Sequence, residues 1–211
     1  MSSETPNINS EPVSQKINRQ EILRVSLETI LNVIVIFAIV FSIRYSFISP
    51  FRVSGNSMQD NLQNEDFILV ARSSYWFSDP EYGDVVVLHP PSSEENFYVK
   101  RVIGAPGDTI EFNKGNMYIY NDQYPNGNKL PNDYLTASNS GNTYLPNKQN
   151  ARIALGVDEY FVVGDNRRAS SDSRSWYTAD PSTKGAVSLD RIVGKAWVDV
   201  LPTPQLIDDL K

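Results

Sequence analysis

The feature that most restricts this chain is a long apolar stretch near its N-terminus, VSLETILNVIVIFAIVFSI, which runs from Val25 to Ile43. Arg24 and Arg44 bracket it with 19 residues between them, and Glu28 is the only charged residue inside. A helix needs about 20 apolar residues to cross a bilayer. A buried core helix is the alternative, but the almost unbroken apolar run favours the membrane. The stretch therefore predicts a transmembrane helix.

The composition on either side of this stretch divides the chain into three parts. Residues 1–24 are polar and lack apolar periodicity, so we expect a disordered tail. Residues 25–46 are expected to form an uncleaved signal anchor, because no small-residue cleavage site follows the span. Residues 47–211 remain for a folded domain. Three basic residues precede the span and two follow it closely, a bias that slightly favours an N-terminus inside the cell.

After residue 50 the sequence is typical of an all-β domain. Short apolar or alternating runs are separated by turn signals such as YGD, APGD and NKGN, and no long helical period competes. The runs are FILVAR (67–72), DVVVLH (84–89), FYVKRVI (97–103), TIEF (109–112), MYIY (117–120), YFVVG (160–164) and IVGKAWVDVL (192–201). Residues 121–150 are rich in Asn, Gly, Pro and Tyr, and we expect hairpins and loops inserted between strands. The sequence predicts a mainly β fold.

The composition excludes several kinds of functional site. The chain has no cysteine and a single histidine, His89 in LHPP, so thiolate and multi-histidine metal sites cannot be built. A carboxylate-rich metal site stays formally open, but we expect neither a metal nor a cofactor. A Ser-His-Asp triad would have to use His89, whose proline-flanked setting is more typical of an exposed strand end. The net charge of −6 provides no basic surface for nucleic acid.

One lysine stands in an unusual position, because Lys100 lies inside the apolar run FYVKRVI. Strand alternation places Lys100 on one face with Tyr98 and Val102, and Arg101 on the other. Lys100 could be an edge-strand lysine that limits aggregation. It could instead be a buried lysine, a usable base near neutral pH because burial disfavours its charged form. A serine nucleophile needs such a base, and Ser57 in SGNSMQDNL is the candidate.

Four sequence boxes follow the apolar span in a characteristic order: SGNSMQDNL, YGDVVVL, YVKRVIGAPGD and GDNRRASSDSR. Together they resemble the type I signal peptidases, serine–lysine endopeptidases that remove signal peptides from exported proteins. The resemblance extends from about residue 30 to about residue 200, and no single box would carry it alone. It implies a signal-peptidase-type antiparallel β-sheet catalytic domain with one N-terminal transmembrane helix.

The resemblance also implies roles for residues in the boxes. Ser57 would be the nucleophile, with its backbone N–H donating to the oxyanion, and Lys100 would be the general base. Ser170 would hydrogen-bond the lysine amine and orient it, and Met58 would pack beside the nucleophile. The family's structural polar framework behind the site would consist of Arg101, Asp165, Asp172 and Arg174.

The chain departs from the family pattern at two places. Gly55 stands where some members carry a hydroxyl side chain that donates to the oxyanion, which leaves the second donor open. Ser54, one residue earlier, is not assumed to substitute. The letters RRAS, residues 167–170, replace a more usual Asn-rich spacer, and we expect this change to concern the surface.

The resemblance implies a membrane-anchored serine endopeptidase that cleaves signal peptides through an acyl-enzyme. Its partners would be preproteins with small residues before the cut, and the lipid bilayer; no nucleic acid is expected. It would be a single-pass cell-membrane protein with its catalytic domain on the extracytoplasmic side. One alternative is a non-catalytic, membrane-anchored β-domain. Another is a self-cleaving repressor-type Ser-Lys protease, which would need a DNA-binding segment where this chain has its apolar span.

Overall fold

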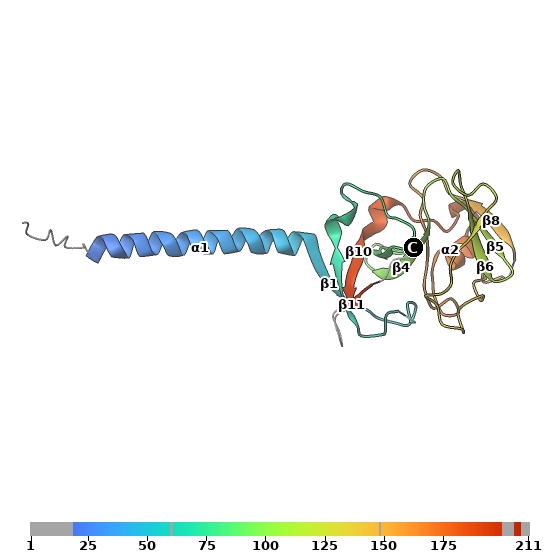
Figure 1. Cartoon of the computed structure of the whole chain (residues 1–211), viewed down its shortest axis with the longest axis horizontal. Coiled ribbons are helices and arrows are strands. Elements are labelled where there is room, and N and C mark those ends of the chain that lie inside the picture. Colours follow the sequence, from blue (N-terminus) through green and yellow to red (C-terminus); the bar gives the residue numbers. More distant parts are fainter. Residues whose placement is uncertain (1–18, 60, 148, 200–204, 208–211) are drawn as a thin grey trace, which may run out of the picture. The chain divides into compact units, whose positions relative to one another are not determined.

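The chain consists of two units that meet between Arg44 and Tyr45. The structure, a computed structural model, describes residues 19–59, 61–147, 149–199 and 205–207. The first unit contains most of helix α1 (Arg19–Phe47), and the second contains all the strands described below (Figure 1). The mainly β, antiparallel fold with one N-terminal apolar helix is thus confirmed.

Helix α1 begins earlier than the sequence analysis placed it. Residues 19–24 were assigned to the polar tail but form the first turns of the helix, and the rest of that tail lies outside the described residues. Arg24 pairs with Glu28 one turn later at 3.1 Å, and Glu21 suits the positive end of the helix dipole. From Arg19 to Ser42 the helix has 24 residues, about 36 Å, and by length and composition it can cross a membrane.

The larger sheet is antiparallel throughout. Its strands follow the order β1 (Ile48–Arg52), β2 (Phe67–Ala71), β10 (Ile192–Asp199), β3 (Val85–Leu88), β4 (Tyr98–Gly104) and β9 (Phe161–Val163), and β11 (Gln205–Leu206) pairs with β10. Strand β3 is buried on both faces: Val85 and Val87 join one apolar cluster, and Val86 and Leu88 join another. This double burial explains the unbroken apolar run in DVVVLH.

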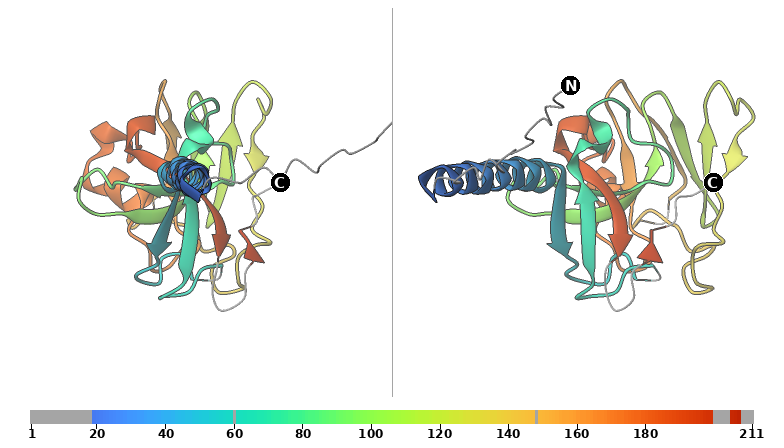
Figure 2. Two further views of the ribbon diagram at one scale, coloured as in Figure 1. Left: turned by 90° about the vertical axis from the view of Figure 1, so that its left-hand side faces the viewer. Right: turned by 60° about the vertical axis from the view of Figure 1, so that its left-hand side comes forward.

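A smaller antiparallel sheet has the strand order β7 (Asn128–Lys129), β6 (Asn116–Tyr120), β5 (Thr109–Asn113) and β8 (Ala151–Ala154). Both ribbon views place β5, β6 and β8 at the side of the second unit away from β1 (Figures 1 and 2). Ile110 and Phe112 of this sheet share a buried cluster with Ile103 and Phe161 of the larger one. Gly104 permits this contact, because a Cβ there would lie 2.6 Å from the Ile110 side chain.

All seven predicted strands are present with slightly different bounds, and the last two residues of the 192–201 run lie outside the described part. Strands β1, β7, β8 and β11 were not predicted, nor was the short helix α2 (Ser173–Ala179). Asp172 caps α2 in a capping box, in which Ser175 Oγ accepts from the Asp172 N–H at 3.1 Å. Three 3₁₀ turns complete the list: η1 (Arg72–Tyr75), η2 (Pro181–Thr183) and η3 (Leu189–Arg191). Apart from β7, the described residues of 121–150 form turns and loops.

We expect a shortened protein that starts at Ile48 to keep the β fold, because all three buried apolar clusters consist of residues from Phe51 onward. Near-UV circular dichroism should match that of the full chain, and the Tm should stay within a few degrees. A spectrum without fixed aromatic signals would contradict this expectation and show that α1 contributes to the core.

Candidate active site

Ser57 lies in a tight turn, which we call the nucleophile turn: residues 56–59, 61 and 62. The Asn56 carbonyl accepts from the Gln59 N–H at 3.1 Å, and the Met58 carbonyl accepts from the Leu62 N–H at 2.9 Å. The side chains of Met58 and Leu62 are both 1% exposed and belong to the apolar cluster around β2 and β3. The turn is therefore fixed to the core at two points, as the predicted packing of Met58 beside Ser57 requires.

Gly55 precedes this turn with a backbone φ of +100°, in the region that favours glycine. A Cβ at this position would have no atom within 4 Å, so the backbone conformation and not lack of space calls for glycine. The Gly55 N–H donates to Asn64 Oδ1 at 2.7 Å. This N–H is therefore already used, and Gly55 does not supply the second oxyanion donor that the sequence left open.

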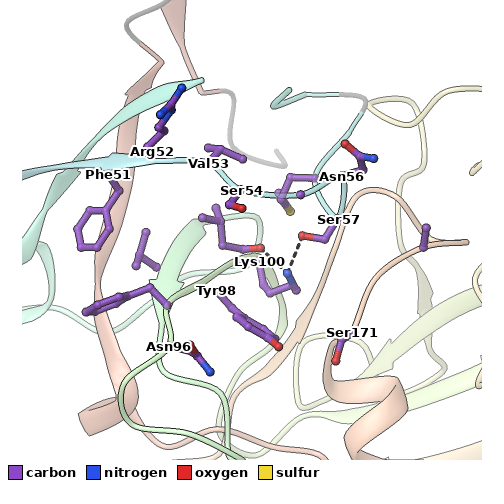
Figure 3. Close-up of a pocket in the computed structure, with 16 residues that line it drawn as sticks. Phe51, Arg52, Val53, Ser54, Asn56, Ser57, Asn96, Tyr98, Lys100 and Ser171 are labelled. Atoms are coloured by element: carbon purple, nitrogen blue, oxygen red, sulfur yellow. Dashed lines mark hydrogen bonds between the residues drawn. The ribbon is translucent and has the colours of Figure 1, made fainter. Parts of the chain in front are cut away.

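Lys100 is buried, with 3% of its surface exposed, and it reaches Ser57 directly. Its Nζ donates to Ser57 Oγ at 2.8 Å and to the Val99 carbonyl at 2.8 Å, and it lies 5.0 Å from the centre of the Tyr98 ring (Figure 3). In strand β4, residues 98–100 pair only with β3, and pairing with β9 begins at Arg101. The burial of the Lys100 side chain, and not its place in the sheet, therefore decides between the two alternatives: it is the buried lysine.

Burial lowers the pKa of Lys100 to about 8, because the ammonium loses its hydration inside the protein. Asp172 and Asp165 oppose this change and Arg174 adds to it. A lysine with this pKa has a substantial neutral fraction near pH 8. Its amine can then accept a proton from the serine hydroxyl next to it.

Behind Ser57 and Lys100 lie two buried arginine–carboxylate pairs, and both are bidentate. Arg101 donates to the two oxygens of Asp165 at 2.9 and 2.7 Å. Arg174 donates in the same way to Asp172 at 2.9 and 2.7 Å. Burial opposes ionisation of Asp172, but Arg174 and the Gly164 N–H outweigh it and hold the pKa of this carboxyl below its ordinary value.

The three residues after β9, Gly164 to Asn166, run directly along the nucleophile turn. Only glycine fits at 164, because a Cβ would lie 2.4 Å from the Ser57 carbonyl oxygen and 2.3 Å from Ser170 Oγ. Asp165 accepts a hydrogen bond from Asn61 of the turn at 2.7 Å. The ion-pair framework thus contacts the turn directly, through a residue that the sequence analysis did not single out.

Ser170 does not form the hydrogen bond to Lys100 that the family resemblance implies. Its Oγ is buried and has no hydrogen bond of good geometry among the described residues. The hydroxyl lies near the Asp172 carboxylate, whose ionised form it helps to stabilise. The lysine makes its bonds to Ser57 and Val99 instead, so the orienting role of Ser170 stays a prediction.

The expectation that the RRAS letters concern only the surface is wrong for Arg167. Arg168 and Ala169 are exposed, but Arg167 is only 3% exposed. It donates to Thr143 Oγ1 at 2.8 Å and to the hydroxyl of Tyr134, both in the 121–150 segment. A buried guanidinium needs such partners. Sequence reasoning missed it because they lie far away along the chain.

A cleft of about 440 Å³ opens beside Ser57 and Lys100. Residues 51–58 form one wall, residues 96–100 form the other, and Ala169 and Ser171 contribute from the loop after β9 (Figure 3). The sheet curls so that its edge strand β1 faces β4, and the rings of Phe51 and Phe97 are 5.2 Å apart.

His89 is not among the residues that line the cleft. Its Nδ1 lies 3.1 Å from the Asn96 carbonyl oxygen, and its ring lies 4.5 Å from that of Phe97. Across the part of the chain that the structure describes, no group of three or more His, Cys, Asp or Glu side chains could hold a metal ion. Among the residues that line the cleft, Ser57 and Lys100 are joined directly by a side-chain hydrogen bond.

Asp165→Asn should destabilise the fold by about 3–5 kcal/mol, because it leaves the Arg101 guanidinium buried and without its counter-ion. The matched control is Glu111→Gln, which weakens the more exposed Arg152–Glu111 pair and should cost less than about 1 kcal/mol. Urea unfolding of the two variants measures both. Equal losses would contradict a structural role for the buried pair.

Because of the lowered pKa of Lys100, the free energy of unfolding should increase as pH rises from about 8 to about 10.4, the ordinary lysine pKa. In this window the unfolded chain holds a proton that the folded chain has lost, so ΔG of unfolding increases with pH. The increase is at most about 3 kcal/mol. Lys100→Met should lack this increase in urea titrations at each pH. Parallel curves for the two proteins would mean that the lysine pKa is not lowered.

The profile of the family described as "Signal peptidase, peptidase S26" matches residues 26–201. Signal peptidase IB of Staphylococcus aureus is 33% identical over 175 residues, which cover 80% of this chain and 86% of that protein. A probable signal peptidase I-2 of Synechocystis is 31% identical over 159 residues, covering 73% of this chain and 63% of that protein.

Among solved structures, a signal peptidase I from Enterococcus faecalis is 29% identical, with a TM-score of 0.42. The match covers 56% of this chain and 97% of that one. The family match extends over most of the chain and includes all four boxes on which the resemblance was based. The chain therefore belongs to the signal peptidase family, peptidase S26, a family of hydrolytic enzymes, as its sequence predicted.

Proposed function

We propose that this chain is a membrane-anchored serine endopeptidase that removes N-terminal signal peptides from exported preproteins. One observation carries the proposal: the buried Lys100 Nζ lies 2.8 Å from Ser57 Oγ. A serine hydroxyl needs an adjacent base to become a nucleophile, and a lysine with a pKa of about 8 can serve as that base. The names of the relatives supply the substrate class.

In the proposed reaction, the neutral Lys100 amine takes the Ser57 proton while Oγ attacks the scissile carbonyl of the substrate. The Ser57 N–H donates to the oxyanion, an interaction worth roughly 3–4 kcal/mol per donor in comparable sites. The lysine, now protonated, gives its proton to the leaving amine and an acyl-enzyme remains. Lys100 then activates a water molecule that hydrolyses this ester.

The free edge of β4 supports binding of an extended peptide. Residues 98–100 pair with β3 on one side, whereas pairing with β9 begins only at Arg101. The other edge of residues 98–100 faces the cleft, where a substrate could add as a further strand. The apolar side chains of Val53, Val87 and Val99 are among the residues that line the cleft, and an apolar lining is compatible with small residues before the cut.

Helix α1 supports the membrane anchor. It is apolar over enough residues to cross a bilayer, and a signal peptide emerges at that same boundary. We propose a single pass with the catalytic unit on the extracytoplasmic side, which agrees with three basic residues before the span and two after it.

The rival functions make different predictions for Ser57. A non-catalytic β-domain would form no covalent adduct, whereas the proposed peptidase should be acylated at Ser57 by a β-lactam-type inhibitor. A repressor-type protease would cut only its own chain. Incubation with a preprotein whose signal peptide ends in Ala-x-Ala, followed by mass spectrometry of the products, distinguishes such a repressor-type protease from a signal peptidase.

Ser57→Ala and Lys100→Arg should both abolish cleavage of that preprotein, because a guanidinium stays protonated at any workable pH and cannot act as a base. His89→Gln, outside the cleft, should cleave at nearly the unaltered rate. The unaltered enzyme should become faster as pH rises through about 8, where the Lys100 amine loses its proton. Circular dichroism checks that each variant is folded.

The opposite pattern would refute the Ser-Lys assignment. If His89→Gln removed activity while Lys100→Arg retained it, histidine would be the base. A rate that rises near pH 6.5 and loses this rise in His89→Gln would lead to the same conclusion.

A further inference from the structure

Asn166 holds the backbone on both sides of the nucleophile. Its side-chain amide donates to the Asn56 carbonyl at 3.0 Å, and its own backbone N–H donates to the Ser57 carbonyl at 3.0 Å. A carbonyl oxygen only accepts hydrogen bonds, so the group of Asn166 that faces Asn56 must be the NH₂. Two successive peptide groups are thus fixed by one residue.

The orientation of these carbonyls determines where the neighbouring N–H groups point. In a trans peptide the C=O and the following N–H point in opposite directions within one plane. The Asn56 carbonyl points toward Asn166, so the Ser57 N–H points away from it. The same holds for the Ser57 carbonyl and the Met58 N–H.

The Ser57 N–H also has no acceptor of its own. Within the described residues neither it nor the Met58 N–H donates to a protein group, although both residues line the cleft. The carbonyl groups of the turn are occupied: Asn56 also accepts from Gln59 at 3.1 Å, and the Ser57 carbonyl is packed against Gly164. The turn therefore leaves its donors, and not its acceptors, for a ligand.

We propose that Asn166 is a positioning residue for the oxyanion hole, which keeps the Ser57 N–H directed at the substrate carbonyl. The proposal rests on the function proposed above, since it concerns the oxyanion formed when Ser57 attacks. Without the side-chain bond, the Asn56 carbonyl keeps only the hydrogen bond from the Gln59 N–H, so the Asn56–Ser57 peptide plane has more freedom to rotate. Donors that must be reoriented during the reaction stabilise its transition state less.

Asn166→Ala removes the side-chain donor without adding charge, and Asn166→Asp keeps the shape but cannot donate. In both variants kcat should fall about 10- to 100-fold while KM changes little, because the interaction matters in the transition state. The backbone bond from residue 166 remains in both, so folding should be preserved. The matched control is Asn142→Ala, whose amide donates to the Ser138 carbonyl at 3.0 Å in an exposed loop; its kcat should not change.

Three further measurements separate positioning from a general structural defect. A peptide aldehyde, which forms a tetrahedral adduct with Ser57, should bind Asn166→Ala more weakly by the same factor as the loss in kcat. The product peptide should bind equally well to both proteins. The pH midpoint of kcat for Asn166→Ala should stay at about 8, because Lys100 keeps its surroundings.

An unchanged kcat, a loss confined to KM or an unchanged aldehyde affinity would each overturn the proposal. Failure of the underlying function gives a different result. In that case the unaltered protein would not cleave the preprotein, or Ser57→Ala would still cleave it or bind the aldehyde normally, whatever Asn166 does.

Discussion

The proposed active site depends on a buried lysine, Lys100, that forms no ion pair with a carboxylate among the described residues. Two aspartates lie near enough to raise its pKa, but each is bound at both oxygens by an arginine. The loss of hydration at Lys100 therefore prevails over the attraction of Asp165 and Asp172. If one of the arginines were missing, its partner would be free to stabilise the ammonium, and the lysine would hold its proton. The proposed neutral base would thus require Arg101 and Arg174, neither of which lines the cleft.

Strand β4 supplies both halves of this arrangement through simple alternation. Lys100 and Arg101 are neighbours, so their side chains leave opposite faces of the strand. The first reaches Ser57, and the second reaches Asp165, which follows β9 two residues after Val163. Since Arg101 is paired with Val163 in the sheet register, the position of Asp165 follows from that register. A shift of one residue between β4 and β9 would exchange the two faces and disrupt the nucleophile site and the framework together.

The sequence was sufficient for elements whose signal is local. Alternating and apolar runs located seven strands, and the apolar span located α1. Strands β1 and β8 were missed because ISPFR and ARIA are short and contain a proline or an arginine that weakens the pattern. Helix α2 was missed because it spans only seven residues, although its capping box, Asp172 with Ser175, was a usable signal.

The candidate site was harder to predict beyond the residues of the family boxes. Ser57, Lys100 and the arginine–aspartate pairs come together as the resemblance implies, but the bond expected from Ser170 is not formed. Arg167 donates to the hydroxyls of Thr143 and Tyr134, more than 20 residues away, and Asn166 donates to two backbone carbonyls of the nucleophile turn. Residue type gives no indication of such contacts. Such contacts depend on which distant segments pack against each other, and patterns in a single sequence do not show that packing.

The curl of the larger sheet has one more consequence, which concerns self-association. A sheet with unpaired strand edges can recruit strands from other molecules and so begin to aggregate. At β1 this risk is reduced by Pro50, which has no N–H to offer, and by the charge of Arg52. At β4 the open edge of residues 98–100 lies inside a cleft of about 440 Å³. The protein can therefore offer an unpaired backbone edge to an extended segment that enters the cleft, while less of that edge is open to the surfaces of folded neighbours.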